Sequence, residues 1–127
     1  MTDAPDLSIL MVNWNTRDMT LACLRSVFAE TRDTSFELIL VDNGSADGSA
    51  EAIAAEFPQV KVIAESENHG FAKANNIAAK LATGQYLLLL NTDTVVLDGA
   101  IDKIVAFARA NPSAKLWGAR TLWEDGT

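Results

Sequence analysis

The sequence LILVDNGS occupies residues 38–45, where four apolar residues are followed at once by polar residues and a glycine. A short apolar run bounded by turn residues is typical of a strand buried on both faces of a parallel sheet. Residues 7–12, 60–63 and 86–90 repeat the pattern, and a fifth strand is expected to begin near Leu116. These runs predict the strands of one sheet.

Apolar residues recur at helical spacing between these runs, so each predicted strand is followed by a predicted helix. Alternation of strands and helices indicates an α/β fold, a mostly parallel sheet with helices on both faces. Pro58, Gly84 and the Asn111-Pro112 pair follow the second, third and fourth helical segments and would end them. The expected core positions are Leu21, Leu24, Val27 and Phe28; Ala50, Ile53, Ala54 and Phe57; Ala74, Ile77, Ala78 and Leu81; and Ile101, Ile104, Val105 and Ala108.

Length and composition indicate a single domain over residues 1–127, because 49% hydrophobic content supplies one compact core. The formal net charge of -7 argues against a nucleic-acid partner, since acidic surfaces repel phosphate. Cys23 is the single cysteine, so no internal disulfide can form, and we expect a cytoplasmic protein. The sequence has no secretory signal pattern and no apolar run long enough to cross a bilayer.

Polar residues follow three of the four predicted strands: NWN at residues 13–15, DNGS at 42–45 and NTD at 91–93. Ligands of open parallel sheets bind beyond the carboxyl ends of the strands, where loop amides and helix N-termini converge. A single Asp or Asn at such a place is usually a turn former or a helix cap, and we assign Asp47 and Asp98 as caps. The three segments together predict a binding site at this edge.

Asp93 is the carboxylate that capping explains poorly, because it closely follows an apolar run that we expect to be buried. A carboxylate beside a buried strand requires a cation or hydrogen-bond donors. Mg²⁺ or Mn²⁺ held by one carboxylate, with water and diphosphate oxygens completing the shell, is common at nucleotide sites. We therefore predict Asp93 as the metal ligand.

The segment NHGFAKANN at residues 68–76 opens the third predicted helix, whose first amides and Lys73 could face an anion. The alternative makes Lys73 a solvated surface charge. We interpret His69 as a loop residue.

Several other site types fail at specific positions. Residues 42–53 lack the ligands of a calcium-binding loop, and the chain has neither a P-loop nor a dinucleotide fingerprint. A phosphoacceptor receiver domain would need an acidic pair after the first strand, and a sugar-1-phosphate nucleotidyltransferase would need a glycine-rich, arginine-containing loop there. A non-catalytic nucleotide-sugar sensor remains open.

Four motifs together resemble the inverting glycosyltransferase family 2, of GT-A fold, and within it the rhamnosyltransferase-like branch. They are VNWNT at residues 12–16, VDNGSADGS at 41–49, NHGFAKANN at 68–76 and LLNTDT at 89–94. Their order and spacing match the family over residues 7–94, and residues 117–127 resemble its next strand and turn more weakly. The resemblance implies a Rossmann-like nucleotide-diphospho-sugar transferase fold.

At the nucleoside end of the site, the resemblance implies that Asp42 hydrogen-bonds the base. Asn13 and Asn15 would line the same pocket, and Asn43 joins the donor-binding set.

At the diphosphate end, the resemblance implies that Asp93 ligates Mn²⁺ or Mg²⁺. The family motif is often Asp-x-Asp, whereas Asn91 stands first here, which weakens metal affinity and leaves Asn91 to hydrogen-bond the sugar or ribose. Lys73 and Asn76 fall where the family contacts the diphosphate or sugar.

The implied reaction is inverting transfer of a sugar, with rhamnose from a dTDP donor as the leading choice and UDP- and GDP-linked sugars as alternatives. The acceptor would be a saccharide or a lipid-linked molecule, and the full-length enzyme would associate peripherally with the inner face of the membrane. The general base of related enzymes lies beyond residue 127, so we expect a fragment that lacks the acceptor half and is weak or inactive alone. Glu124 and Asp125 precede Gly126 in an expected turn and are poor substitutes for that base.

Overall fold

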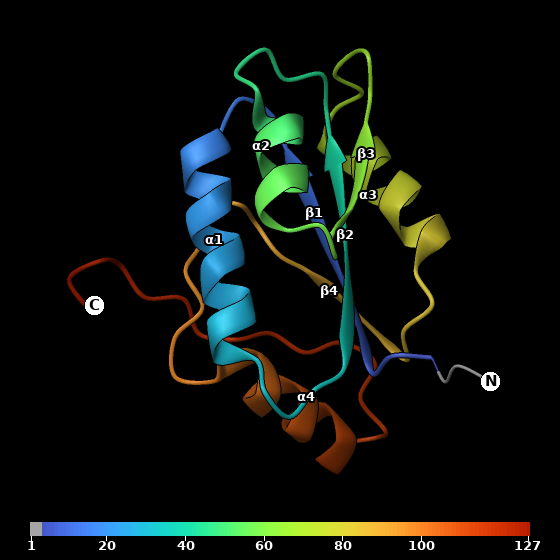
Figure 1. Ribbon diagram of the computed structural model, residues 1–127. Helices are drawn as coiled ribbons and strands as arrows, with labels where there is room; N and C mark the ends of the chain where they lie inside the picture. The colour runs from blue at the N-terminus through green and yellow to red at the C-terminus, as the bar shows by residue number, and fades with distance from the viewer. Residues whose placement is uncertain (1–3) are drawn as a thin grey trace.

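The computed structural model describes residues 4–127 and contains a four-stranded parallel sheet. The strands are β1 (Leu7–Asn13), β2 (Phe36–Asp42), β3 (Lys61–Ala64) and β4 (Tyr86–Leu89), in the spatial order β3-β2-β1-β4. All three strand pairs are parallel (Figure 1). The α/β fold and the four predicted strands are confirmed, each to within about two residues.

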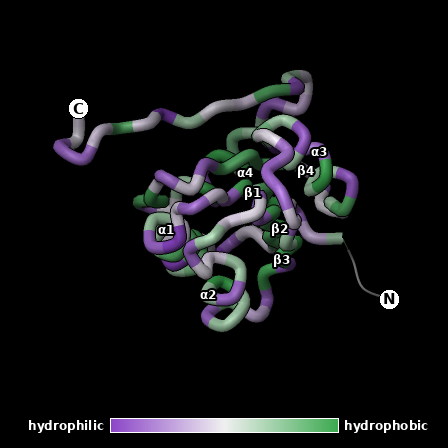
Figure 2. Tube along the Cα trace, turned by 90° about the horizontal axis from the view of Figure 1, so that it is seen from above, coloured by the Kyte–Doolittle hydropathy of each residue, from purple (hydrophilic) through white to green (hydrophobic). Residues whose placement is uncertain are grey.

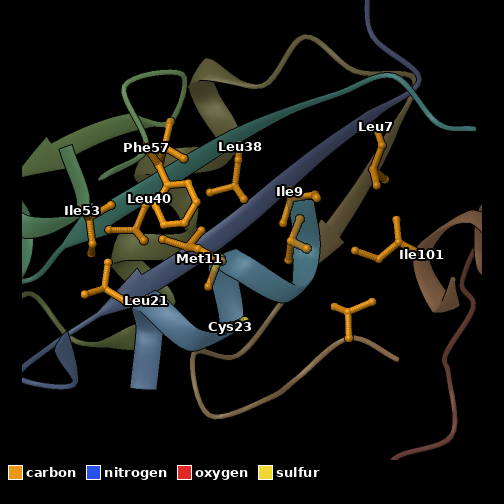
Figure 3. Packing of buried hydrophobic residues seen from close by; sticks show 14 of the residues in the cluster. Leu7, Ile9, Met11, Leu21, Cys23, Leu38, Leu40, Ile53, Phe57 and Ile101 are labelled. Atoms are coloured by element: carbon orange, nitrogen blue, oxygen red, sulfur yellow. The ribbon is translucent and has the colours of Figure 1, made fainter. Parts of the chain in front are cut away.

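Helices cover both faces of the sheet, which places two cores on its opposite sides. The helices are α1 (Arg17–Glu30), α2 (Ser49–Glu56), α3 (Phe71–Leu81) and α4 (Ala100–Ala110). Side chains of α1, α2 and α4 pack with Ile9, Met11 and Leu40 on one face, part of which Figure 3 shows from close by. Of the helices in residues 4–127, only α3 packs on the other face, where Ala74 and Ala78 meet Leu10 and Ile39.

Side chains alternate between the two faces along each strand, and this alternation also governs the strand ends. Met11 and Leu40 point toward α1, so Asn13 and Asp42, two residues further on, point the same way. Val12 lies on the α3 side instead. Since Asn13 and Asp42 are register partners in the β1–β2 pair, their side chains are neighbours.

The predicted fifth strand near Leu116 is wrong for the part of the chain that the structure describes. Residues 112–127 form turns and bends joined by backbone without regular secondary structure, and the hydrogen bonds among their backbone groups are local. Leu116 is 91% exposed, and the end of the segment projects from the layered body (Figure 2). An apolar run forms a strand only where a neighbouring strand accepts its backbone hydrogen bonds.

The predicted helix faces hold except at two positions, Ala54 and Leu81, which are exposed. Helix α2 has only eight residues at the border of the sheet and buries Ile53, while Leu81 is the last residue of α3. No helix among residues 4–127 combines the length and apolar character that a bilayer crossing requires.

Neither Asp47 nor Asp98 is the N-cap of its helix, because Gly48 takes that place in α2 and Gly99 in α4, but Asp47 still accepts amides at the start of two helices. The Asp47 carboxylate accepts the backbone N–H of Ser49 at 3.0 Å and that of Arg17 at 3.0 Å, which are the first residues of α2 and α1. The Ser49 hydroxyl above all, with these amides, holds the pKa of Asp47 below its usual value. At α4, Gly99 occupies the N-cap and its N–H goes to Glu30 at 3.2 Å.

Candidate functional site

A hollow of about 680 Å³ opens at the carboxyl ends of β1, β2 and β4, within the range of small-molecule sites. Each of the three polar segments that follow these strands contributes to its wall. The lining residues are Val12, Trp14, Thr16, Met19, Asn43, Asn68, Gly70, Phe71, Asn91, Thr92 and Asp93. The hollow therefore lies at the edge of the sheet where the sequence predicts a binding site.

Asp42 and Asn13 lie beneath the rim of this hollow and do not line it. Asp42 is 3% exposed and Asn13 is fully buried, because both side chains point toward α1. The Asp42 carboxylate accepts hydrogen bonds from Asn13 Nδ2 at 2.7 Å, Ser45 Oγ at 2.6 Å and Ser45 N at 3.1 Å. No basic side chain among residues 4–127 pairs with Asp42, so these donors compensate its burial.

Two asparagines join neighbouring loops around the site. Asn15, in the left-handed region at φ 53°, accepts the backbone N–H of Ala46 at 2.8 Å and so ties the β1–α1 loop to the β2–α2 loop. Asn43 lines the hollow, accepts the N–H of His69 at 3.1 Å and donates to the carbonyl oxygen of Gly70 at 3.1 Å. Asn43 thereby holds His69 and Gly70, the two residues before α3, close to the end of β2.

Asp93 and Asn91 both line the hollow and are exposed, which corrects the reason for singling out Asp93. Strand β4 is an edge strand whose Leu87 and Leu89 are more than half exposed, so Asp93 suffers no burial that demands a cation. No group of three His, Cys, Asp or Glu side chains able to hold a metal occurs between residues 4 and 127. The arrangement fits an ion of the Mg²⁺ type that takes one protein carboxylate and keeps water and substrate oxygens.

Lys73 and Asn76 lie on the exposed side of α3, outside the lining of the hollow. His69 stands in the loop before α3, as predicted, with Nε2 3.5 Å from Glu65 and Nδ1 3.7 Å from Glu67. These contacts direct the imidazole to the loop's own carboxylates.

Half-exposed apolar side chains form walls that the sequence-based set of site residues omits. Trp14 is 52% exposed, and Met19 and Phe71 are exposed to a similar degree. Trp14 immediately follows Asn13 in the first polar segment, so an aromatic residue at the end of a buried strand was an available signal. Large apolar groups left in contact with solvent at a hollow can pack against the flat face of a ligand.

Glu124 and Asp125 form the expected turn, closed by the Gly126 N–H to the Trp123 carbonyl oxygen at 2.8 Å. Neither carboxylate lines the hollow. Asp125 instead accepts hydrogen bonds from Thr127.

The family model for "Glycosyl transferase family 2" matches residues 8–127, nearly the whole chain. The chain belongs to glycosyltransferase family 2. Membership agrees with the four motifs, while the comparisons do not resolve the rhamnosyltransferase-like branch.

Among curated relatives of this family, the O-antigen biosynthesis protein RfbC of Myxococcus xanthus is 31% identical over 97% of this chain and 10% of its own length. Glycosyltransferase GlyG of Streptococcus pneumoniae is 29% identical over 77% of this chain and 33% of its own length. The chain thus spans a third or less of these two relatives.

Solved structures share the fold. The mannosyltransferase PcManGT of Pyrobaculum calidifontis, in complex with GDP-Man and Mn²⁺, superposes with a TM-score of 0.73 at 23% identity, over 84% of this chain and 33% of that one. S. aureus TarS in complex with UDP-GlcNAc gives 0.72 at 23% identity, over 83% and 31%. The sheet and its helices are therefore GT-A-like.

Proposed function

We propose that this chain is the donor-binding part of a family 2 glycosyltransferase, and that its hollow holds a nucleoside diphosphate sugar with Mn²⁺ or Mg²⁺. The observation that carries the proposal is the convergence of residues 13–16, 42–45 and 91–93 on one edge of the sheet, with half-exposed Trp14 and exposed Asp93 in the wall of one hollow. An aromatic wall and a carboxylate are complementary to the two ends of such a donor.

The base would lie against Trp14, whose indole offers a face for stacking. Asp42 lies beneath the rim and would have to shift toward the hollow to read the base edge. It would do so through Oδ2, because Oδ1 accepts two hydrogen bonds and Oδ2 only that of Ser45 N. Asn43 would contact the donor from the wall of the hollow. Asn13 and Asn15 would serve the donor indirectly, by holding Asp42 and the adjacent loop.

The diphosphate would lie toward Asp93, which would hold the metal ion, with Asn91 contacting the sugar or ribose. A bound divalent ion neutralises charge on the departing nucleoside diphosphate. Lys73 and Asn76 lie on the helix that begins beside the hollow at Phe71, and we retain them as contacts to the diphosphate or sugar.

Inverting transfer also needs a general base for the acceptor hydroxyl. Asp93 is the only carboxylate among the residues that line the hollow, and its assigned role is metal binding. We therefore propose that this chain by itself binds the donor with little or no transfer. The alternative function is that of a non-catalytic nucleotide-sugar sensor.

The donor we propose is dTDP-rhamnose, on the strength of the motif resemblance. GDP-Man and UDP-GlcNAc, bound by PcManGT and TarS, are the alternatives. A role in polysaccharide biosynthesis fits the name of the M. xanthus relative, an O-antigen biosynthesis protein. The acceptor we propose is a saccharide or a lipid-linked molecule at the inner face of the membrane.

Calorimetric titration of dTDP, UDP and GDP, each with and without Mn²⁺, tests donor binding. One nucleotide should bind in a metal-dependent manner, and Asp93→Asn should remove the dependence. Asp98→Asn is the matched control, since Asp98 is exposed, lies outside the hollow and adopts a left-handed conformation that Asn tolerates. Metal-independent binding that Asp93→Asn leaves unchanged would refute the assigned site.

A transfer assay with the matching nucleotide sugar tests the second part. We expect nucleoside diphosphate to be released no faster with the chain present than by uncatalysed hydrolysis of the nucleotide sugar. Robust transfer to an acceptor would contradict the proposal.

A further inference from the structure

We propose that Asn13 is a positioning residue that couples the two ends of the proposed donor site through Thr16 and Thr92. The base end is at Asp42, and the metal end is the loop of residues 91–93, here called the metal loop. This inference rests on the proposed function, because it assumes a nucleotide near Asp42 and a metal ion at Asp93. It assigns Asn13, Thr16 and Thr92 roles different from donor contact.

Every hydrogen-bonding position of the Asn13 side chain is occupied by protein. Nδ2 donates to Asp42 Oδ1 at 2.7 Å and to Ser45 Oγ at 3.2 Å. Oδ1 accepts from Thr16 Oγ1 at 2.8 Å and from Thr20 Oγ1 at 2.7 Å. An amide has two donors and two acceptor positions, so none remains for a ligand.

These partners also fix the orientation of the amide. Turning it by 180° would place Oδ1 against the Asp42 carboxylate, and neither oxygen has a hydrogen to donate. Because Asn13 is fully buried, the lost hydrogen bonds could not be replaced by water. Asn13 therefore holds Asp42 and Thr16 in one mutual arrangement.

Thr16 carries the connection onward to the metal loop. Its Oγ1 lies 3.4 Å from Oγ1 of Thr92, the residue between Asn91 and Asp93. Since the Thr16 hydrogen is used on Asn13, the proposal assigns Thr92 as the donor in this contact. This contact is the longest of those that join Asp42 to Thr92. A shift of residues 91–93 would therefore change its length first.

The series Asp42–Asn13–Thr16–Thr92 thus joins two ends of the donor that share no other recorded side-chain contact in the described residues. A base that draws Asp42 toward the hollow would act on Thr92 through two fixed groups. Conversely, a metal ion that orders residues 91–93 would favour the Asp42 position that reads the base.

The test is the factor by which Mn²⁺ tightens binding of the nucleoside diphosphate that the native chain prefers, measured by calorimetry on the full 127-residue chain. Thr92→Val removes the donor with little change of shape. The factor should fall about three- to fivefold, the loss expected for one neutral hydrogen bond. Thr92→Ser keeps the hydroxyl and should restore the native factor.

A second variant tests the connection to Thr16. Thr16→Val should lower the same factor, because it removes both the Asn13 and the Thr92 contacts of Oγ1. Adding Thr92→Val to it should cost nothing further, because the contact between the two threonines is already lost. Thr31→Val is the matched control, since the Thr31 hydroxyl is buried without a hydrogen-bond partner and lies at the far end of α1.

The outcomes separate this proposal from the proposed function. A native chain without metal-dependent binding overturns both. A native chain with the dependence, joined to a Thr92→Val variant that retains the full factor, overturns the coupling alone. A Thr92→Ser variant as impaired as Thr92→Val also overturns it, because the hydroxyl would then be irrelevant.

Discussion

The side-chain amide of Asn13 donates a 2.7 Å hydrogen bond to the carboxylate of Asp42, its register partner on the adjacent strand. Both residues lie at strand ends where a ligand site is expected, yet both point toward α1 and away from solvent. The amide nitrogen of Asn13 donates a hydrogen to Asp42, and its oxygen accepts from the hydroxyls of Thr16 and Thr20. A residue that only accepts hydrogen bonds could not do both.

Replacing Asn13 by Asp should destabilise the fold. The new carboxylate would face that of Asp42 without a hydrogen between them. Either one of the two carboxylates takes up a proton, or two buried negative charges face each other without a donor. We expect a loss of about 3 kcal/mol at pH 7 in urea unfolding, as for a buried charge without a partner.

Asn15→Asp is the matched control for this prediction. Asn15 is exposed and uses only its carbonyl oxygen, on the N–H of Ala46, a role that a carboxylate oxygen also fills. An equal loss in the two variants would show that the Asn13–Asp42 contact is not the cause.

The strands were predictable because a strand covered on both faces needs an apolar side chain at nearly every position. Residues 38–41 illustrate this, since all four are buried. The same reasoning failed at Leu116, which is apolar but has no adjacent strand to pair with. It also overstated the burial around Asp93, because strand order is not evident from composition and β4 proved to be an edge.

The position of the hollow was predictable from the sequence, but the contacts of the residues around it were not. Residues that end neighbouring parallel strands must share one edge, which brought Asn43, Asn91 and Asp93 to one hollow. Whether a strand-end side chain points into that hollow depends on which face each helix covers. Asn13 points toward α1 because α1 covers the face of the sheet on which Met11 lies. Side chains two residues apart on a strand share a face, so the sequence could have predicted that Asn13 lies on the same face as Met11.

Trp14→Ala should weaken binding of the preferred nucleoside diphosphate about tenfold, within the range for loss of one base–aromatic stack. Stability should change little, because Trp14 is half exposed. Calorimetry measures the affinity and thermal unfolding checks the fold. Trp123→Ala is the control: this tryptophan is 80% exposed, lies outside the hollow, and its removal should leave affinity unchanged.

Gly84→Ala should destabilise the sheet where β4 begins. A Cβ at residue 84 would lie 2.6 Å from the backbone nitrogen of Ser8 and 2.7 Å from the carbonyl carbon of Leu7. The backbone of β1 would have to move, at a cost of about 3 kcal/mol in urea unfolding. Gly118→Ala meets nothing within 4 Å and should be nearly neutral, and comparable losses at both glycines would contradict the steric explanation.

Asp102 should make stability depend on pH in the acid range. Burial alone would raise the pKa of Asp102, but the backbone N–H of Arg32, the Thr34 hydroxyl and the backbone N–H of Asp33 together hold it below the ordinary 3.8. A carboxyl whose folded pKa lies below its unfolded pKa stabilises the fold above the unfolded value. That contribution disappears as pH falls through the folded pKa.

Asp102→Asn should therefore lower the free energy of unfolding by about 1–2 kcal/mol at neutral pH, the scale of hydrogen bonds to a charged acceptor. The gap between native and variant should narrow once the pH falls below about 4, as the native carboxyl takes up its proton. Urea unfolding across this range measures the gap. Asp33→Asn is the matched neighbour, exposed and with no hydrogen bond recorded to its carboxylate, so its stability should follow that of the native chain. A gap for Asp102→Asn that stays constant into acid would mean that shape, and not charge, accounts for the loss.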